Sequence, residues 1–115
     1  MIGFLSIALF SAASLASIAD AETSRVSYSN CLVDFTIAQL DQKTGTSAFR
    51  KAAQSTCTAE RDAMIASIKK DEMEFGSSEA EASSYAAEEA DGVLFAYTDS
   101  YAGYASSNTR PVQEE

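Results

Sequence analysis

The arrangement of apolar and polar residues divides the chain into an uncharged leading stretch and a longer helical part. Residues 2–19 carry no charge and mix apolar residues with alanine and serine. From residue 22 onward, apolar residues recur every three or four positions. This spacing is typical of amphipathic helices and not of strands. The sequence therefore predicts an all-α protein that follows a targeting segment.

Three helices are predicted, over residues 24–43, 48–75 and 79–105. Gly45 separates the first two, because glycine readily takes the left-handed conformation that ends a helix. Gly76 separates the second from the third, and Ser78 with Glu81 has the S-x-x-E form of a capping box. Short connections favour antiparallel neighbours, so we expect a small three-helix bundle.

The leading stretch has the features of a secretory signal peptide. Its apolar region ends in Ala19, Asp20 and Ala21, which form an A-x-A cleavage site. Cleavage after Ala21 is expected, and a retained membrane anchor is the alternative. The predicted organisation is a signal peptide over 1–21, a helical domain over 22–105 and a disordered tail over 106–115. We expect a periplasmic or secreted protein that does not contact the membrane after cleavage.

The sequence contains two cysteines, Cys31 and Cys57. Export to an oxidising compartment favours a disulfide between them. In an antiparallel hairpin that turns at Gly45, Cys31 lies 14 positions before the turn and Cys57 lies 12 after it. At a rise of about 1.5 Å per residue, the mismatch is only about 3 Å. We therefore expect a disulfide-stapled antiparallel helical hairpin plus a third long helix.

The charge of the chain excludes several classes of function. The 115 residues include 17 acidic and 8 basic residues, for a net charge of −9, and no histidine. Without histidine, neither a Ser-His or Cys-His nucleophile nor a histidine-ligated zinc or haem can form. Nucleic acids and anionic membranes attract basic proteins, so we expect neither as a partner. The charge is also uneven, since residues 22–70 carry +2 and residues 71–115 carry −10.

Acidic residues around Gly76 are candidates for contact with a cationic partner. Asp71, Glu72 and Glu74 form the first cluster, and oxygen-rich clusters can bind divalent cations weakly. No D-x-[DN]-x-[DN]-G loop is present, so we expect a solvated acidic face, with no metal and no cofactor. Glu60 interrupts the apolar face of the second helix and is a candidate for a perturbed carboxylate, unless its stem packs and its head reaches solvent.

A binding function is expected, and an enzyme is not. Paired carboxylates need a cleft that desolvates one of them, which a small helical bundle does not readily provide. Phe95 falls opposite the core side of the third helix, among Glu88 and Asp91. These three residues are candidate contacts with an unknown protein partner or a second copy of the chain.

One short segment resembles the small periplasmic proteins related to LprI-type lysozyme inhibitors. The resemblance lies in Ala90, Asp91 and Leu94 followed by Tyr97, without the Asn that those proteins carry after the Leu and with fewer cysteines. It is too small to assign a family. It implies an alternative function, the inhibition of a cationic cell-wall hydrolase such as lysozyme, to which an acidic protein would be attracted. A weak divalent-cation binder is a further alternative.

Overall fold

The computed structural model describes residues 20–115, which form four helices and no strand. The helices are α1 (Ala21–Asp41), α2 (Thr46–Ala53), α3 (Thr58–Glu74) and α4 (Glu79–Ser107). The predicted all-α fold is confirmed. The predicted signal peptide lies outside the described residues, except that Asp20 caps α1 by accepting a hydrogen bond from the Thr23 N–H and Ala21 is the first residue of that helix.

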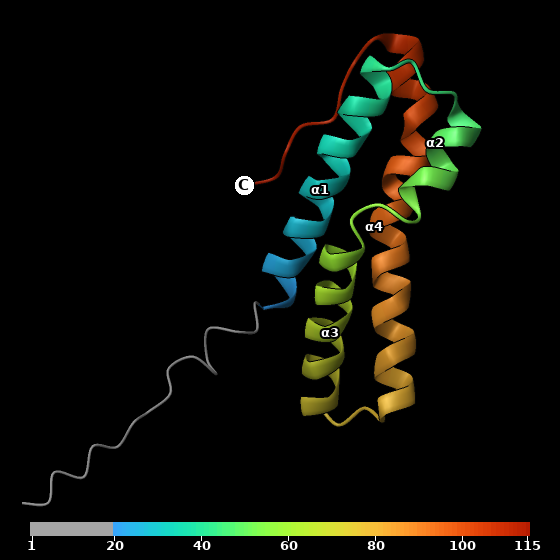
Figure 1. The fold of residues 1–115 in the computed structure, drawn as a ribbon. Helices are drawn as coiled ribbons and strands as arrows, with labels where there is room; N and C mark the ends of the chain where they lie inside the picture. Colours follow the sequence, from blue (N-terminus) through green and yellow to red (C-terminus); the bar gives the residue numbers. More distant parts are fainter. Residues whose placement is uncertain (1–19) are drawn as a thin grey trace, which may run out of the picture.

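Helix α4 runs the full length of the molecule and the other helices pack along it (Figure 1). Helix α3 lies beside the N-terminal half of α4, whereas α1 and α2 flank its C-terminal half. Helix α1 also packs against α3, and the two are joined by the Cys31–Cys57 disulfide, whose Cα atoms lie 6.0 Å apart. The predicted disulfide and the small helical bundle are confirmed.

The second predicted helix is wrong in one respect, because it is not continuous over 48–75. Residues 54–57 separate α2 from α3. Cys57 has a φ of 53°, a left-handed conformation that a helix interior does not allow. The helical periodicity of the sequence continues through this segment. The disulfide and the packing of α2 on α4 nevertheless interrupt the helix at residues 54–57.

The core consists of two connected clusters. The larger one lies between α1, α3 and α4 and contains Tyr28, Leu32, Met64, Ile68, Ala86 and Ala90. The smaller one contains Phe49, Ala53 and Tyr101, and Leu94 and Tyr97 pack against both. Alanines on α4 let α3 approach closely, since a small side chain brings two helix axes together.

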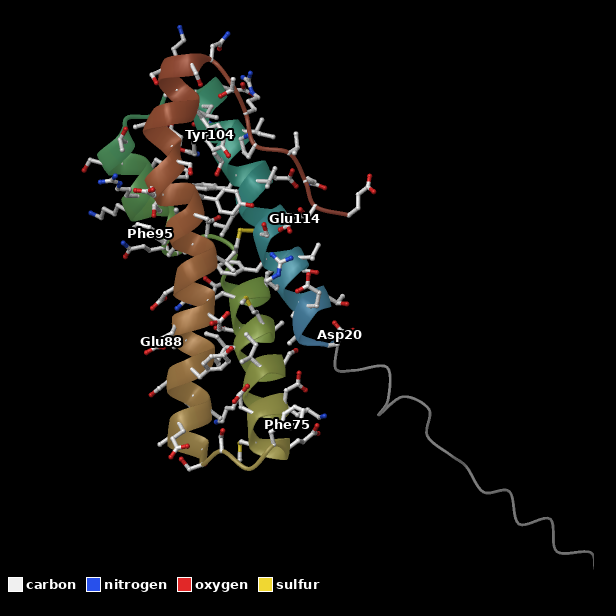
Figure 2. The ribbon with its side chains drawn as sticks, turned by 180° about the vertical axis from the view of Figure 1, so that it is seen from behind. Asp20, Phe75, Glu88, Phe95, Tyr104 and Glu114 are labelled. Carbon is white, nitrogen blue, oxygen red and sulfur yellow. A yellow bond between two sulfur atoms is a disulfide. The ribbon has the colours of Figure 1, made fainter. Side chains whose placement is uncertain are left out.

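The end of the chain differs from the expected disordered tail. Ser106 and Ser107 belong to α4, and Asn108 ends the helix in a left-handed conformation. The remaining residues turn back along α1, where Glu114 bonds to Arg25 and Asn30 (Figure 2). Polar composition predicts disorder, whereas specific pairing with α1 holds this segment in place.

Candidate functional site

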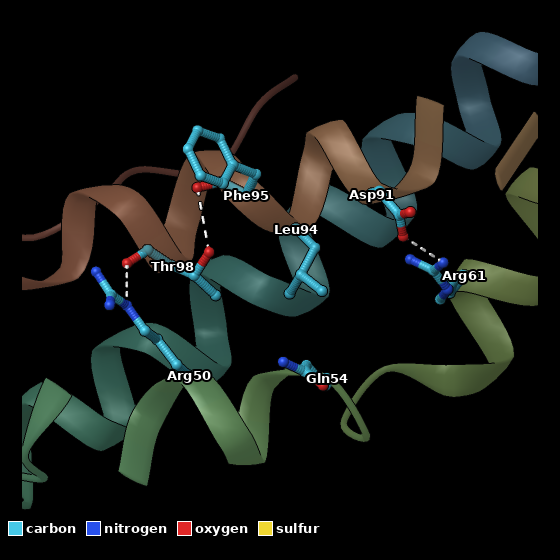
Figure 3. A pocket seen from close by; sticks show the side chains of 7 residues that line it. All are labelled: Arg50, Gln54, Arg61, Asp91, Leu94, Phe95 and Thr98. Carbon is cyan, nitrogen blue, oxygen red and sulfur yellow. Dashed lines mark hydrogen bonds and ion pairs between the residues drawn. The ribbon is translucent and has the colours of Figure 1, made fainter. Parts of the chain in front are cut away.

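A groove opens between α4 and the segment that joins α2 to α3 (Figure 3). It encloses about 420 Å³. Its lining combines two arginines, one acid and an apolar floor, from Arg50, Gln54, Arg61, Asp91, Leu94, Phe95 and Thr98. The groove brings two predicted contact residues, Asp91 and Phe95, into one site.

An ion pair closes one end of the groove. Arg61, in the first turn of α3, donates from Nη2 to Oδ1 of Asp91 on α4, at 2.6 Å. Burial lowers the pKa of the Arg61 guanidinium, but hydrogen bonds to Asp91 and Tyr28 outweigh it, so the pKa is raised overall. The Asp91 side chain is 66% exposed, and such pairs contribute little stability. Because the Arg61 side chain is only 24% exposed, Asp91 is the member of the pair that a partner can contact.

The apolar part of the groove comes from α4. The Leu94 side chain points into the groove, whereas the Phe95 ring stands at its rim (Figure 3). Phe95 is 64% exposed. Opposite, Arg50 of α2 donates from Nε to the carbonyl of Thr98, at 3.4 Å. A groove lined by an exposed aromatic and two arginines has the composition of a protein contact site.

Glu88 lies on the same side of α4 as Phe95 (Figure 2). It is exposed, as is Asp91 between them. We refer to Glu88, Asp91, Phe95 and the adjoining groove as the Phe95 face. All three candidate contacts on the third predicted helix thus fall on one surface.

The other predicted acids lie at the far end of the molecule. We refer to Asp71, Glu72, Glu74 and Phe75 as the acidic tip. Phe75 ends α3 and is 88% exposed, and the next residue, Gly76, has a φ of 104° that glycine adopts without strain. The Glu74 carboxylate accepts a hydrogen bond from Lys70. The turn therefore presents an exposed aromatic ring that follows three acidic residues of α3 in the sequence.

The acids of the tip do not converge on a cation site. Within residues 20–115, one group of three potential metal ligands lies within 4.8 Å of one another, and it consists of Cys31, Cys57 and Glu60. Because the two sulfurs are bonded to each other, this group offers one carboxylate. Glu60, the candidate perturbed carboxylate, is thus placed beside the disulfide in the first turn of α3.

The two arginines of the groove, Arg50 and Arg61, are candidate site residues that the sequence did not single out. Arg61 and Asp91 are equally distant from Gly76 along the chain. In an antiparallel helix pair that turns at this glycine, opposite charges at equal distances face each other, so this pair could have been predicted. Arg50 could not, because its position depends on the break between α2 and α3.

Comparison of the chain with protein-family models, curated proteins and solved structures gives no match. Among the helices of residues 20–115, none combines the length and apolarity needed to cross a membrane. This finding and the disulfide are compatible with a periplasmic or extracellular protein.

Proposed function

We propose that the protein is a small exported binding module without catalytic activity, which contacts a protein partner or a second copy of itself through the Phe95 face. The observation that carries the proposal is the exposed Phe95 ring beside the groove. Phe95 and Leu94 together give the groove an apolar surface with charged residues around it, and such patches mark interaction sites. Aromatic and arginine side chains also dominate the energy of protein interfaces.

The charges of the Phe95 face support a partner of mixed charge. Glu88 and Asp91 attract a basic group, whereas Arg50 and Arg61 attract a carboxylate. Paired residues of opposite sign in one patch favour a defined orientation of the partner. We propose a periplasmic or secreted location, where the disulfide is stable.

The first experiment compares Phe95→Ser with Phe75→Ser. Both remove an exposed ring, so neither should affect folding. Light scattering on the mature protein measures self-association, and affinity capture from the native compartment recovers a partner. We expect Phe95→Ser to abolish the dimer or the captured partner and Phe75→Ser to retain it. If both variants behave as the unmodified protein does, the Phe95 face is not the contact surface.

Inhibition of a cationic hydrolase is a second candidate, favoured by the acidic tip. Phe75 protrudes at the end of two helices, and residues 71–91 contain eight acids and no base. An exposed aromatic side chain next to acidic residues fits an apolar cleft that has basic residues at its edge. The opposite charges of the two proteins would also accelerate their association.

This candidate predicts inhibition of lysozyme at low salt that weakens as salt screens the charges. Phe75→Ser should then abolish inhibition, and Phe95→Ser should not. Full lysozyme activity with excess protein at low salt would exclude it. The same two variants therefore distinguish the two candidates.

A further inference from the structure

Residues 110–114, which we call the tail, lie on α1 as a bound peptide would. The tail runs antiparallel to α1, since Arg110 pairs with Asp41, Gln113 donates to Asp34 at 2.7 Å, and Glu114 reaches Arg25 and Asn30. Within the tail, the Pro111 side chain is buried. The contacts thus follow α1 over four turns, from its C-terminal end toward its N-terminal end.

Asn30 recognises the backbone of the tail. Its Nδ2 donates to the Glu114 carbonyl at 2.9 Å, and its Oδ1 accepts from the Glu114 N–H at 2.7 Å. The amide therefore satisfies both polar groups of one residue, as a neighbouring strand would. Such a contact requires an extended peptide but no particular side chain.

Arg25 recognises the side chain at the same position. Its Nη1 and Nη2 donate to the two carboxylate oxygens of Glu114, at 3.1 and 2.9 Å. This two-point geometry selects a planar carboxylate. Glu22 accepts from Nε and Nη2 of Arg25 and fixes the orientation of the guanidinium.

The tail is held by contacts that can exchange with solvent. The side chains of both Arg25 and Glu114 are partly exposed, and Val112 is 82% exposed. Exposed ion pairs and hydrogen bonds contribute little free energy each, so release of the tail does not require unfolding of the core.

We infer that α1 carries a peptide-binding site, that the tail is its intramolecular occupant, and that its ligand is a partner's extended peptide with a basic residue and a glutamate four positions apart. Asp41 forms an ion pair with the basic residue, Asn30 hydrogen-bonds to the backbone, and Arg25 binds the carboxylate of the glutamate. The site is separate from the Phe95 face, and the inference does not depend on the proposed function.

The affinity of such a site can be bounded. A ligand tethered by a short flexible linker has an effective concentration on the order of millimolar. The tail occupies the site under this condition, so a free peptide of the same sequence should bind with a Kd on the order of millimolar or tighter. Nuclear magnetic resonance measures affinities in this range.

The test uses a chain that ends at Thr109, so that the cap of α4 is retained, and an acetylated peptide of sequence RPVQEE. We expect saturable shifts of the α1 amides and of the Asn30 side-chain NH₂ signal, and no such shifts in the full-length chain, where the tail occupies the site. Asn30→Ala in the shortened chain should weaken binding about fivefold or more, since two hydrogen bonds are lost. Gln54→Ala is the matched control and should leave binding unchanged, because this amide lies in the groove.

Charge exchange tests the role of Arg25. Arg25→Glu should abolish binding of RPVQEE and permit binding of RPVQKE, in which lysine replaces the residue that corresponds to Glu114. The absence of saturable binding to a shortened chain that retains its helical circular dichroism would overturn the inference. A full-length dimer that disappears on shortening would also overturn it, because the site would then belong to the tail of a second copy.

Discussion

Single residues in the smaller cluster show how a few large side chains hold α2 in place. The rings of Phe49 and Tyr101 stack with centroids 3.9 Å apart, and the Tyr101 hydroxyl donates to the Thr44 carbonyl at 2.6 Å. Phe49 therefore anchors a helix of only eight residues to α4, while the hydroxyl of Tyr101 fixes the turn before it. A helix this short has little stability of its own.

Phe49→Ala should lower the free energy of unfolding by about 3–5 kcal/mol, because it removes a buried ring and leaves a cavity. Urea denaturation followed by circular dichroism measures the change. Phe75→Ala removes the same ring from an exposed position and should change the value by no more than about 0.5 kcal/mol. Equal losses in the two variants would contradict the assignment of Phe49 to the core.

Burial raises the pKa of Tyr97 and of Tyr101 above the ordinary value of 10.0, and for Tyr97 it outweighs the opposing hydrogen bond from Ser29. The folded state thus disfavours the tyrosinate form. The contribution of the two protonated tyrosines to stability is present below pH 10 and is lost as the pH rises through their raised pKa values. In an alkaline titration followed by tyrosinate absorbance, Tyr97→Phe and Tyr101→Phe should each remove part of the late-titrating component.

Among the helices, the break between α2 and α3 decides the shape of the groove. Cys57 takes a left-handed conformation at the start of α3 while its sulfur is bonded to Cys31 of α1. This geometry directs α2 away from the axis of α3 and places Arg50 opposite Thr98. The groove therefore depends on the cross-link as well as on α4.

Replacing both cysteines by serine should lower the free energy of unfolding by about 2–5 kcal/mol. In the Cys31→Ser background, Cys57→Gly should be about 1 kcal/mol more stable than Cys57→Ser, since glycine adopts the left-handed conformation without strain. Thermal and urea unfolding measure both differences. Adding Thr56→Gly to the double serine variant is the control and should be destabilising, because Thr56 is not among the residues of positive φ. A glycine variant no more stable than the serine variant would contradict this explanation of the break.

Across the whole molecule, opposite charges join segments that are distant in the sequence. The Arg25–Glu114 and Arg110–Asp41 ion pairs link the tail to α1, and the Arg61–Asp91 pair links α3 to α4. Local charge counts describe the C-terminal part as uniformly acidic, but the fold pairs several of its acids with bases of the N-terminal part. Further exposed acids, Glu81, Glu88, Glu89 and Asp99, lie along α4.

The tail should leave α1 at acidic pH. The hydrogen bonds from Arg25 and Ser29 hold the pKa of Glu114 below its ordinary value of 4.5, and its other charged or ionisable neighbours are Glu22 and Tyr97. A lowered pKa means that the contact is fully present above pH 4.5 and is lost as the pH falls through the lowered value. The Asn30 side-chain signal of the full-length chain should follow this transition.

Glu114→Gln is the matched control for the acid transition, since it keeps the shape of the side chain and removes its charge. Its Asn30 signal should not respond to pH in the same range. A transition of the same midpoint in both chains would assign the change to another carboxylate.

Local information in the sequence was sufficient for the disulfide and for the helix ends at Gly76 and Ser78. It was not sufficient at the end of α1, where Lys43 and not Gly45 takes the left-handed conformation, and Gly45 is extended before α2. The spacing of Cys31 and Cys57 about the first turn already fits a cross-linked hairpin. The exposure of Phe95 also followed from its place opposite the core side of α4. These features depend on the spacing of residues within one or two helices, which the sequence contains.

The break at Cys57, the groove and the docking of the tail depend on contacts between distant segments. The Cys31–Cys57 disulfide to α1 and the packing of Phe49 of α2 against α4 determine the backbone of residues 54–57. The helical periodicity of the sequence indicates neither of these contacts. Residues 110–114 have the composition of a disordered segment and are held because Asn30 and Arg25 meet Glu114 in three dimensions. The contacts of Glu114 with Asn30 and Arg25 join residues that are 84 and 89 positions apart, and such contacts have no periodic signature in the sequence. The groove and the docked tail are therefore seen only in the folded chain.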